Sequence, residues 1–147
     1  MTARDAGAVP PAGHAEFDHS GDIGIEAWGA TRADLIANAT RGLLGLMTWS
    51  RVDAAVERPI DVRSTGPADL LVDWLSAVIL SAASHGEVYG EVIVTGADET
   101  SASGIVRGAP YDVARHELRF DVKAATYHDL VVEAAPGGFH ARIVFDL

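Results

Sequence analysis

The chain contains no cysteine, which excludes disulfide bonds, thiolate metal ligands and cysteine nucleophiles. No segment reaches the run of about 18 apolar residues that a membrane-spanning helix needs, so we expect no membrane contact. The opening MTARDAGAVPPAGHAE lacks the apolar run of a signal peptide. Together these absences fit a protein of the cytoplasm, where disulfides are rare.

Basic side chains are also scarce. The 11 Lys and Arg residues stand against 21 Asp and Glu residues, which gives a net charge of −10. A protein that binds nucleic acid by itself normally carries a basic patch, because counterion release drives that binding. The nearest approach to one is the group Arg115, His116 and Arg119. Direct nucleic-acid binding is therefore not expected, but an acidic protein can be steered to a basic protein surface.

Several catalytic signatures are missing as well. There is no phosphate-binding glycine loop, no nucleophile elbow, no HExxH motif and no EF-hand loop. No nucleophile is accompanied by a recognisable oxyanion arrangement. The sequence thus predicts a protein that is not an enzyme in its own right.

The chain does have the length and composition of one folded domain. It has 147 residues, and 48% of them are hydrophobic, which is enough for a core. Residues 1–14 are rich in Ala, Gly and Pro and are expected to form a flexible tail, with the domain spanning residues 15–147.

Local patterns predict two helices and several strands. The first helix, 33–47, follows a cap at Thr31 and Asp34, and the second runs from Pro67 to Gly86. Pro59 indicates an edge position or a bulge in its strand. Strands are expected within 16–28, 56–62, 88–95, 104–107, 118–127, 131–134 and 139–145. Because βαβ units do not repeat, we predict an α+β fold with two helices packed on a largely antiparallel β-sheet.

The segment FDHSGDIGIEAWG, residues 17–29, places Asp18, His19 and Asp22 where a buried strand begins. One interpretation is a polar turn in which short side chains bond the backbone. The other is a site for a hard cation such as Ca²⁺, which takes about 6–8 oxygen ligands. Asp146 and the α-carboxylate of Leu147 offer further oxygens, although these residues alone leave their convergence with Asp22 open.

The segment KAATYHDL, residues 123–130, is the second polar cluster. Lys123, Tyr127 and His128 have side chains that act as acids and bases in enzymes. A strand in this region would place Lys123 and Tyr127 on one face and His128 on the other. This structural interpretation is favoured over a catalytic one.

Five segments together resemble the archease family, in order and from Phe17 to Leu147. They are FDHSGDIGIEAWGAT, GLLGLMT, DLLVDWLSAVIL, VKAATYHDLVV and IVFDL. The resemblance implies a small α+β accessory protein of an RtcB-type RNA ligase, which joins RNA ends in tRNA splicing and RNA repair. Such a protein promotes guanylylation of the ligase and repeated turnover.

The resemblance also implies a divalent cation, Ca²⁺ or alternatively Mg²⁺, at one tip of the fold. Its expected ligands here are Asp22, Asp146 and Leu147. Side chains expected to contact these ligands or the partner are Asp18, His19, Lys123 and His128. This chain departs from the family at Ser20-Gly21, where most relatives have Thr-Ala, and at Arg119-Phe120, where Gly-Thr is common.

Three functions remain open on the sequence. The first is the RNA-ligase activator with an acidic tip. The second is a general chaperone, or a modulator of RNA-modifying enzymes such as tRNA methyltransferases, which requires an exposed apolar patch. The third is an independent metal-dependent hydrolase that uses Asp22, His128 and Asp146 and turns over without a partner.

Overall fold

The computed structural model describes residues 9–147, so residues 1–8 of the predicted tail lie outside the described part. In the described residues, two helices and eight strands follow one another without repeating βαβ units, which confirms the α+β prediction. In chain order the elements are β1 (His14–His19), β2 (Asp22–Gly29), α1 (Arg32–Met47), β3 (Val56–Arg63), α2 (Pro67–His85), β4 (Glu87–Ala97), β5 (Ser101–Pro110), β6 (Ala124–Ala125), β7 (Val131–Ala135) and β8 (Gly138–Asp146).

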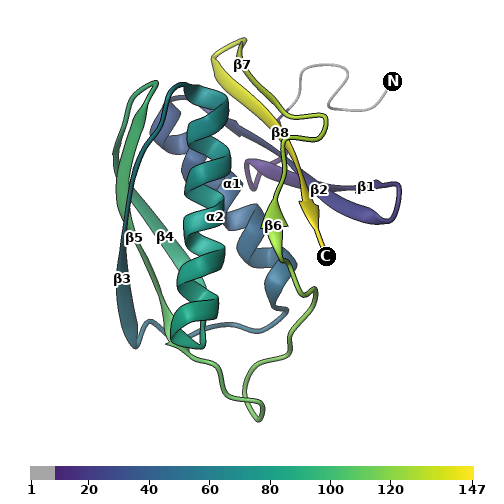
Figure 1. Cartoon of the computed structure of the whole chain (residues 1–147), viewed down its shortest axis with the longest axis vertical. Coiled ribbons are helices and arrows are strands. Elements are labelled where there is room, and N and C mark those ends of the chain that lie inside the picture. The colour runs from purple at the N-terminus through teal and green to yellow at the C-terminus, as the bar shows by residue number, and fades with distance from the viewer. Residues whose placement is uncertain (1–8) are drawn as a thin grey trace.

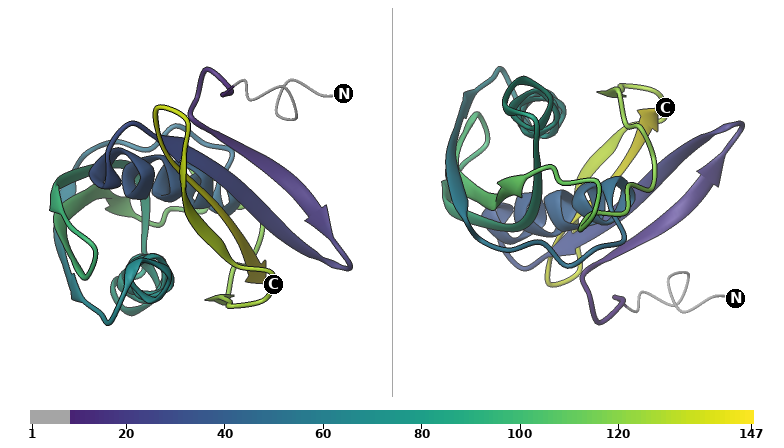
Figure 2. Two further views of the ribbon diagram at one scale, coloured as in Figure 1. Left: turned by 90° about the horizontal axis from the view of Figure 1, so that it is seen from above. Right: turned by 90° about the horizontal axis from the view of Figure 1, so that it is seen from below.

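The strands form two antiparallel sheets with the helices between them (Figures 1 and 2). The larger sheet has the order β1-β2-β8-β6, and β7 also pairs with β8. The smaller sheet has the order β3-β5-β4. Helix α1 contacts β2 of the larger sheet and β4 of the smaller one, while α2 packs against all three strands of the smaller sheet. The protein therefore has one core, shared by both sheets.

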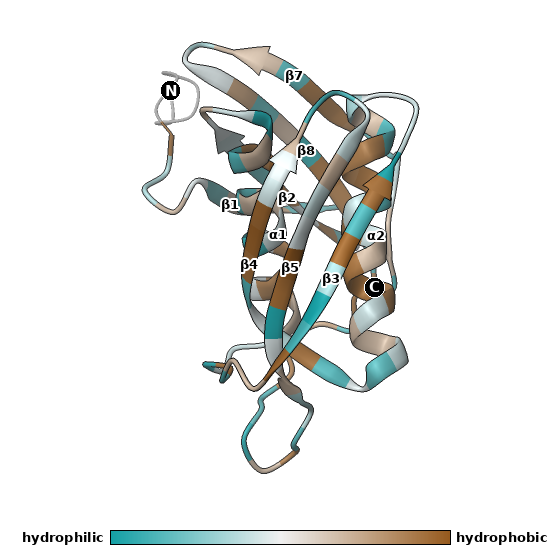
Figure 3. Ribbon diagram, turned by 90° about the vertical axis from the view of Figure 1, so that its left-hand side faces the viewer, coloured by the Kyte–Doolittle hydropathy of each residue, from teal (hydrophilic) through white to brown (hydrophobic). Residues whose placement is uncertain are grey.

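The alternation of buried and exposed side chains along the strands shows which face of each sheet belongs to the core. In β2, Ile23, Ile25 and Ala27 are buried against the helices, and in β8 the buried alternate residues are Ala141, Ile143 and Phe145. Hydropathy also alternates along β3, which lies at an edge of the smaller sheet (Figure 3). The edge position predicted from Pro59 is confirmed, since a proline cannot donate to a second neighbour.

The prediction that no segment is apolar enough to span a membrane needs correction at helix α2. By length and composition, Pro67–His85 is apolar enough to cross a membrane, contrary to the expectation that no segment is. Most of its large apolar residues are instead packed inside this protein, where Leu71, Trp74, Leu75 and Val78 are almost fully buried. The structure thus accounts for its hydrophobicity as that of a core helix.

The strand predicted over 118–127 is wrong, because only Ala124–Ala125 pairs with β8. The backbone N–H groups of Arg119 and Phe120 instead donate to carbonyls of Met47 and Leu46, each at 3.0 Å. Those carbonyls belong to the last turn of α1 and have no partner within the helix. Arg119 and Phe120 thus close the end of α1.

A buried ion pair at the start of β4 makes stability depend on pH. Glu87 accepts hydrogen bonds from Arg58 at 2.9 and 2.7 Å and from the Tyr89 hydroxyl at 3.0 Å. The Arg58 guanidinium is the main reason that the pKa of Glu87 lies below its usual 4.5. A lowered pKa means that charged Glu87 stabilises the fold above the ordinary pKa, and that this contribution is lost as pH falls through the lowered value.

We therefore expect Glu87→Gln to destabilise the protein at neutral pH, with a difference from wild type that shrinks in acid. Urea unfolding from neutral pH down to the acid limit of folding measures this difference. Glu57→Gln is the matched control, because Glu57 is 54% exposed in its pair with Arg107 and exposed pairs contribute little. A Glu87→Gln difference that does not vary with pH would contradict the assignment.

Candidate functional site

The β1–β2 hairpin fixes the first half of the site. Its two strands are joined by Ser20 and Gly21, both with positive φ (42° and 91°), as a two-residue turn of this type requires. The turn sets His19 directly opposite Asp22. Since opposite residues in an antiparallel pair share a face, both side chains point to the same side of the larger sheet.

The register of β2 with β8 brings Asp146 to the same place. Ile23 pairs with Phe145, so one step further along the ladder sets Asp22 opposite Asp146. Ile23 and Phe145 face the core, and the alternation of side chains therefore turns both aspartates to the outer face. Opposite residues have Cβ atoms about 4.5–5.5 Å apart. The structure thus places these two aspartates at neighbouring strand ends on the same face of the larger sheet.

Strand β6 and the last residue, Leu147, lie next to Asp146. Ala124 of β6 pairs with Asp146, and the Lys123 backbone N–H donates to the Asp146 carbonyl at 2.9 Å. Leu147 follows Asp146 directly in the chain. We call Asp22, Asp146 and the Leu147 α-carboxylate the acidic tip. The ligand atoms of the acidic tip are all oxygens, which hard cations prefer. Asp22 is half-buried, whereas Asp146 and Leu147 are exposed, so a cation bound here would keep part of its hydration water.

Two of the predicted neighbours do not share this arrangement. Asp18 pairs with Ile23 and therefore faces the opposite side of the sheet from Asp22. The alternation predicted from Lys123 to His128 is wrong, since the strand covers only Ala124–Ala125. Beyond it the chain turns, with the Thr126 hydroxyl bonded to the Val144 carbonyl at 2.9 Å. Lys123 is exposed and is held here through its backbone.

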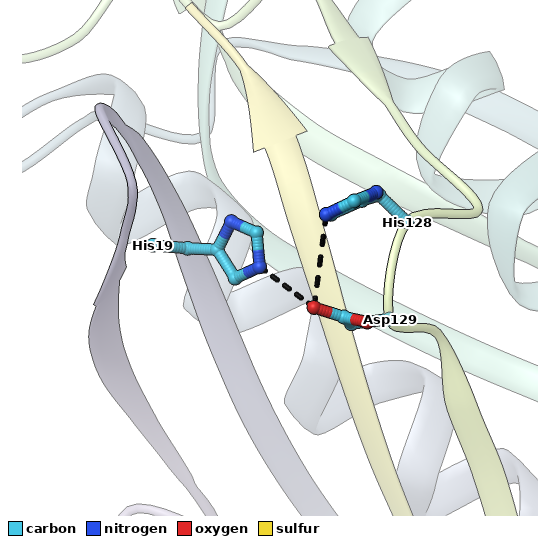
Figure 4. Close-up of side chains that lie close together, drawn as sticks. All are labelled: His19, His128 and Asp129. Carbon is cyan, nitrogen blue, oxygen red and sulfur yellow. Dashed lines mark hydrogen bonds and ion pairs between the residues drawn. The ribbon is translucent and has the colours of Figure 1, made fainter.

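The turn after β6 carries His128 and Asp129 to the hairpin. Asp129 accepts a hydrogen bond from His19 Nε2 at 2.8 Å, and His128 Nε2 lies 3.7 Å from the same oxygen (Figure 4). The hydrogen bond from His19, followed by the charge of His128, holds the pKa of Asp129 below its usual 3.8. We call His19, His128 and Asp129 the histidine cluster. Sequence reasoning missed Asp129, for which the only signal was its place directly after His128.

The outer face beside the tip is filled by aromatic and charged groups. The ring of Phe17 covers Gly24, where an added Cβ would lie 2.1 Å from a ring carbon. The Arg142 guanidinium lies 3.7 Å from the centre of the same ring. Phe17 and Gly24 of the opening motif therefore support the hairpin. Further along the face, His140 bridges Glu26 and Glu133, with both distances 3.0 Å.

Sequence comparison relates this chain to one protein family. The sequence model of the Archease protein family matches residues 14–147. The "Protein archease" of Methanopyrus kandleri is 31% identical over 136 residues, covering 90% of this chain and 97% of that protein. The "Protein archease" of Pyrococcus furiosus is 29% identical over 137 residues, covering 89% and 96%.

Two solved structures share the fold. The solution structure of Methanobacterium thermoautotrophicum protein 1598 has a TM-score of 0.76 and 28% identity, covering 92% of this chain and 99% of that one. A crystal structure from Thermotoga maritima, described as an archease and possible chaperone, has a TM-score of 0.64 and 21% identity, covering 89% and 94%. With the family matched over nearly its whole length, this chain belongs to the archease family.

Proposed function

We propose that this protein activates an RtcB-type RNA ligase in tRNA splicing or RNA repair, and that it does so through the acidic tip. The observation that carries the proposal is the register of β2 with β8, in which Ile23 pairs with Phe145, so that Asp22 and Asp146 occupy the next positions at neighbouring strand ends. Asp22 and Asp146 lie far apart in the sequence, and the pairing of β2 with β8 supports the proposal that they share one ion.

The chemistry of the tip fits an accessory protein. Carboxylates are the ligands of Ca²⁺ and Mg²⁺, and a site with three protein groups leaves positions for water or for oxygens of a partner. When bound, such an ion supplies positive charge that attracts phosphate oxygens. The protein residues hold it, while the net charge of −10 steers the chain toward a basic nucleotide-binding cleft.

The proposal is tested by ligation and guanylylation with a purified RtcB-type ligase, with and without this protein. We expect repeated turnover only when it is present, and no reaction with this protein alone. Asp22→Ala should abolish the stimulation and leave the circular dichroism spectrum unchanged. The matched control is Asp18→Ala, four residues earlier on the opposite face, which should stimulate like wild type. Full stimulation by Asp22→Ala would refute the role of the tip.

A chaperone function, or modulation of RNA-modifying enzymes such as tRNA methyltransferases, is the second candidate. It is favoured by a groove of about 440 Å³ lined mainly by apolar groups between the ends of α1 and α2 and the loop 111–122. Tyr111 and Leu118 line it and are 41% and 53% exposed. Suppression of client aggregation that survives Asp22→Ala but is lost in Leu118→Asp would favour this function over ligase activation.

A further inference from the structure

The histidine cluster offers a donor set different from that of the acidic tip. One ligand atom from each of His19, His128 and Asp129 lies within 4.8 Å of the other two. Two imidazoles from segments more than 100 residues apart converge on a single carboxylate oxygen (Figure 4). The fold therefore assembles two nitrogens and an oxygen beside a site that contains only oxygens.

These separations are close to those of a metal centre. With metal–ligand bonds of about 2.0–2.2 Å, ligand atoms around a tetrahedral ion lie roughly 3.4 Å apart. The 3.7 Å between His128 Nε2 and Asp129 must shorten slightly, and the 2.8 Å between His19 Nε2 and Asp129 must lengthen. His128 and Asp129 are 67% and 61% exposed in a turn, so they can move without disturbing the core.

His19 and Asp129 each have a conformation or an environment that suits a metal ligand. His19, only 14% exposed, presents Nε2 to the cluster, whereas its Nδ1 is buried. Asp129 has φ 51°, a backbone conformation that Asp and Asn adopt more readily than most residues. Its carboxyl group is ionised at neutral pH, as a metal ligand must be.

The donor types decide the class of ion. Imidazole nitrogen suits Zn²⁺, Cu²⁺, Ni²⁺ and Fe²⁺, whereas Ca²⁺ and Mg²⁺ prefer oxygen alone. We propose that His19, His128 and Asp129 bind one divalent transition-metal ion, with Zn²⁺ as the representative ion. Three protein ligands leave a fourth position open to water or to a partner group. This site is separate from the acidic tip and does not rest on the proposed function.

The test is titration of the tag-free, metal-free full chain with Zn²⁺ by calorimetry. We expect one Zn²⁺ ion at the histidine cluster, and at least tenfold weaker binding of that ion in His128→Ala and in Asp129→Asn. Asn keeps the backbone conformation and an oxygen acceptor for His19 but removes the charge. Two controls should bind like wild type. They are Asp22→Ala, which removes an oxygen of the tip, and His85→Ala, which removes an exposed histidine at the end of α2.

A spectroscopic measurement identifies the ligands directly. With Cu²⁺ bound, electron paramagnetic resonance should show hyperfine coupling to two nitrogens in wild type and to one in His128→Ala. Circular dichroism of each variant shows whether it is folded. The proposal is overturned by Zn²⁺ dissociation constants above about 100 µM in the wild type. It is equally overturned by binding that both cluster variants retain in full, or that Asp22→Ala or His85→Ala removes.

Discussion

Replacing Trp74 by alanine should lower the free energy of unfolding by about 3–5 kcal/mol, the usual cost of removing a fully buried aromatic side chain. Trp74 lies in the middle of α2 and is completely buried. Its Nε1–H donates to the Thr40 hydroxyl of α1 at 3.0 Å, and that hydroxyl donates to the Ile36 carbonyl at 2.6 Å. Alanine would therefore remove both the packing and the one side-chain hydrogen bond that joins the two helices in the core.

Two further variants separate these contributions. Thr40→Val keeps the shape of Thr40 but leaves the indole N–H buried without an acceptor, at a cost of about 1–3 kcal/mol. Trp74→Phe removes the donor and part of the volume together. Urea unfolding followed by circular dichroism gives all three values. If Trp74→Ala costs less than Thr40→Val, the packing argument is wrong. Leu80→Ala is the control, because Leu80 lies on α2 but is 66% exposed.

Most of the fold could be predicted because hydrophobic periodicity reports directly on burial. Helix 33–47 and the helix from Pro67 to Gly86 have spacings that only a helix satisfies, and the structure places both within a residue or two. The segment 118–127 failed for a physical reason. Its apolar residues alternate as in a strand, but Arg119 and Phe120 bond to the end of α1, a long-range partner that local patterns do not reveal.

The site was predictable only in part. Asp22 and Asp146 were identified as candidates, and their placement follows from the register between β2 and β8, which no local pattern determines. Asp18 illustrates the limit, since it belongs to the same motif as Asp22 but faces the other side. Asp129 was missed because its importance arises from a contact with His19, 110 positions away.

The end of the chain provides the second strong prediction. Adding Gly-Ser after Leu147 should abolish stimulation of the ligase and weaken Ca²⁺ binding at least tenfold. The extension converts the α-carboxylate of Leu147 into a neutral peptide carbonyl and places new atoms against the acidic tip. Every existing side chain remains, so the core, which ends at the buried Phe145, should keep its stability. Calorimetry with Ca²⁺ and the ligation assay measure the two effects.

Matched variants test whether the charge of the chain end, and not the side chain of Leu147, is responsible. Leu147→Ala should behave like wild type, because Leu147 is expected to contribute only its terminal oxygens. The same Gly-Ser extension at the N-terminus should also have no effect. Asp146→Asn should reproduce the loss, since it neutralises the neighbouring carboxylate while keeping its shape. If the C-terminal extension binds Ca²⁺ as tightly as wild type, the α-carboxylate is not a ligand and the tip consists of Asp22 and Asp146 alone.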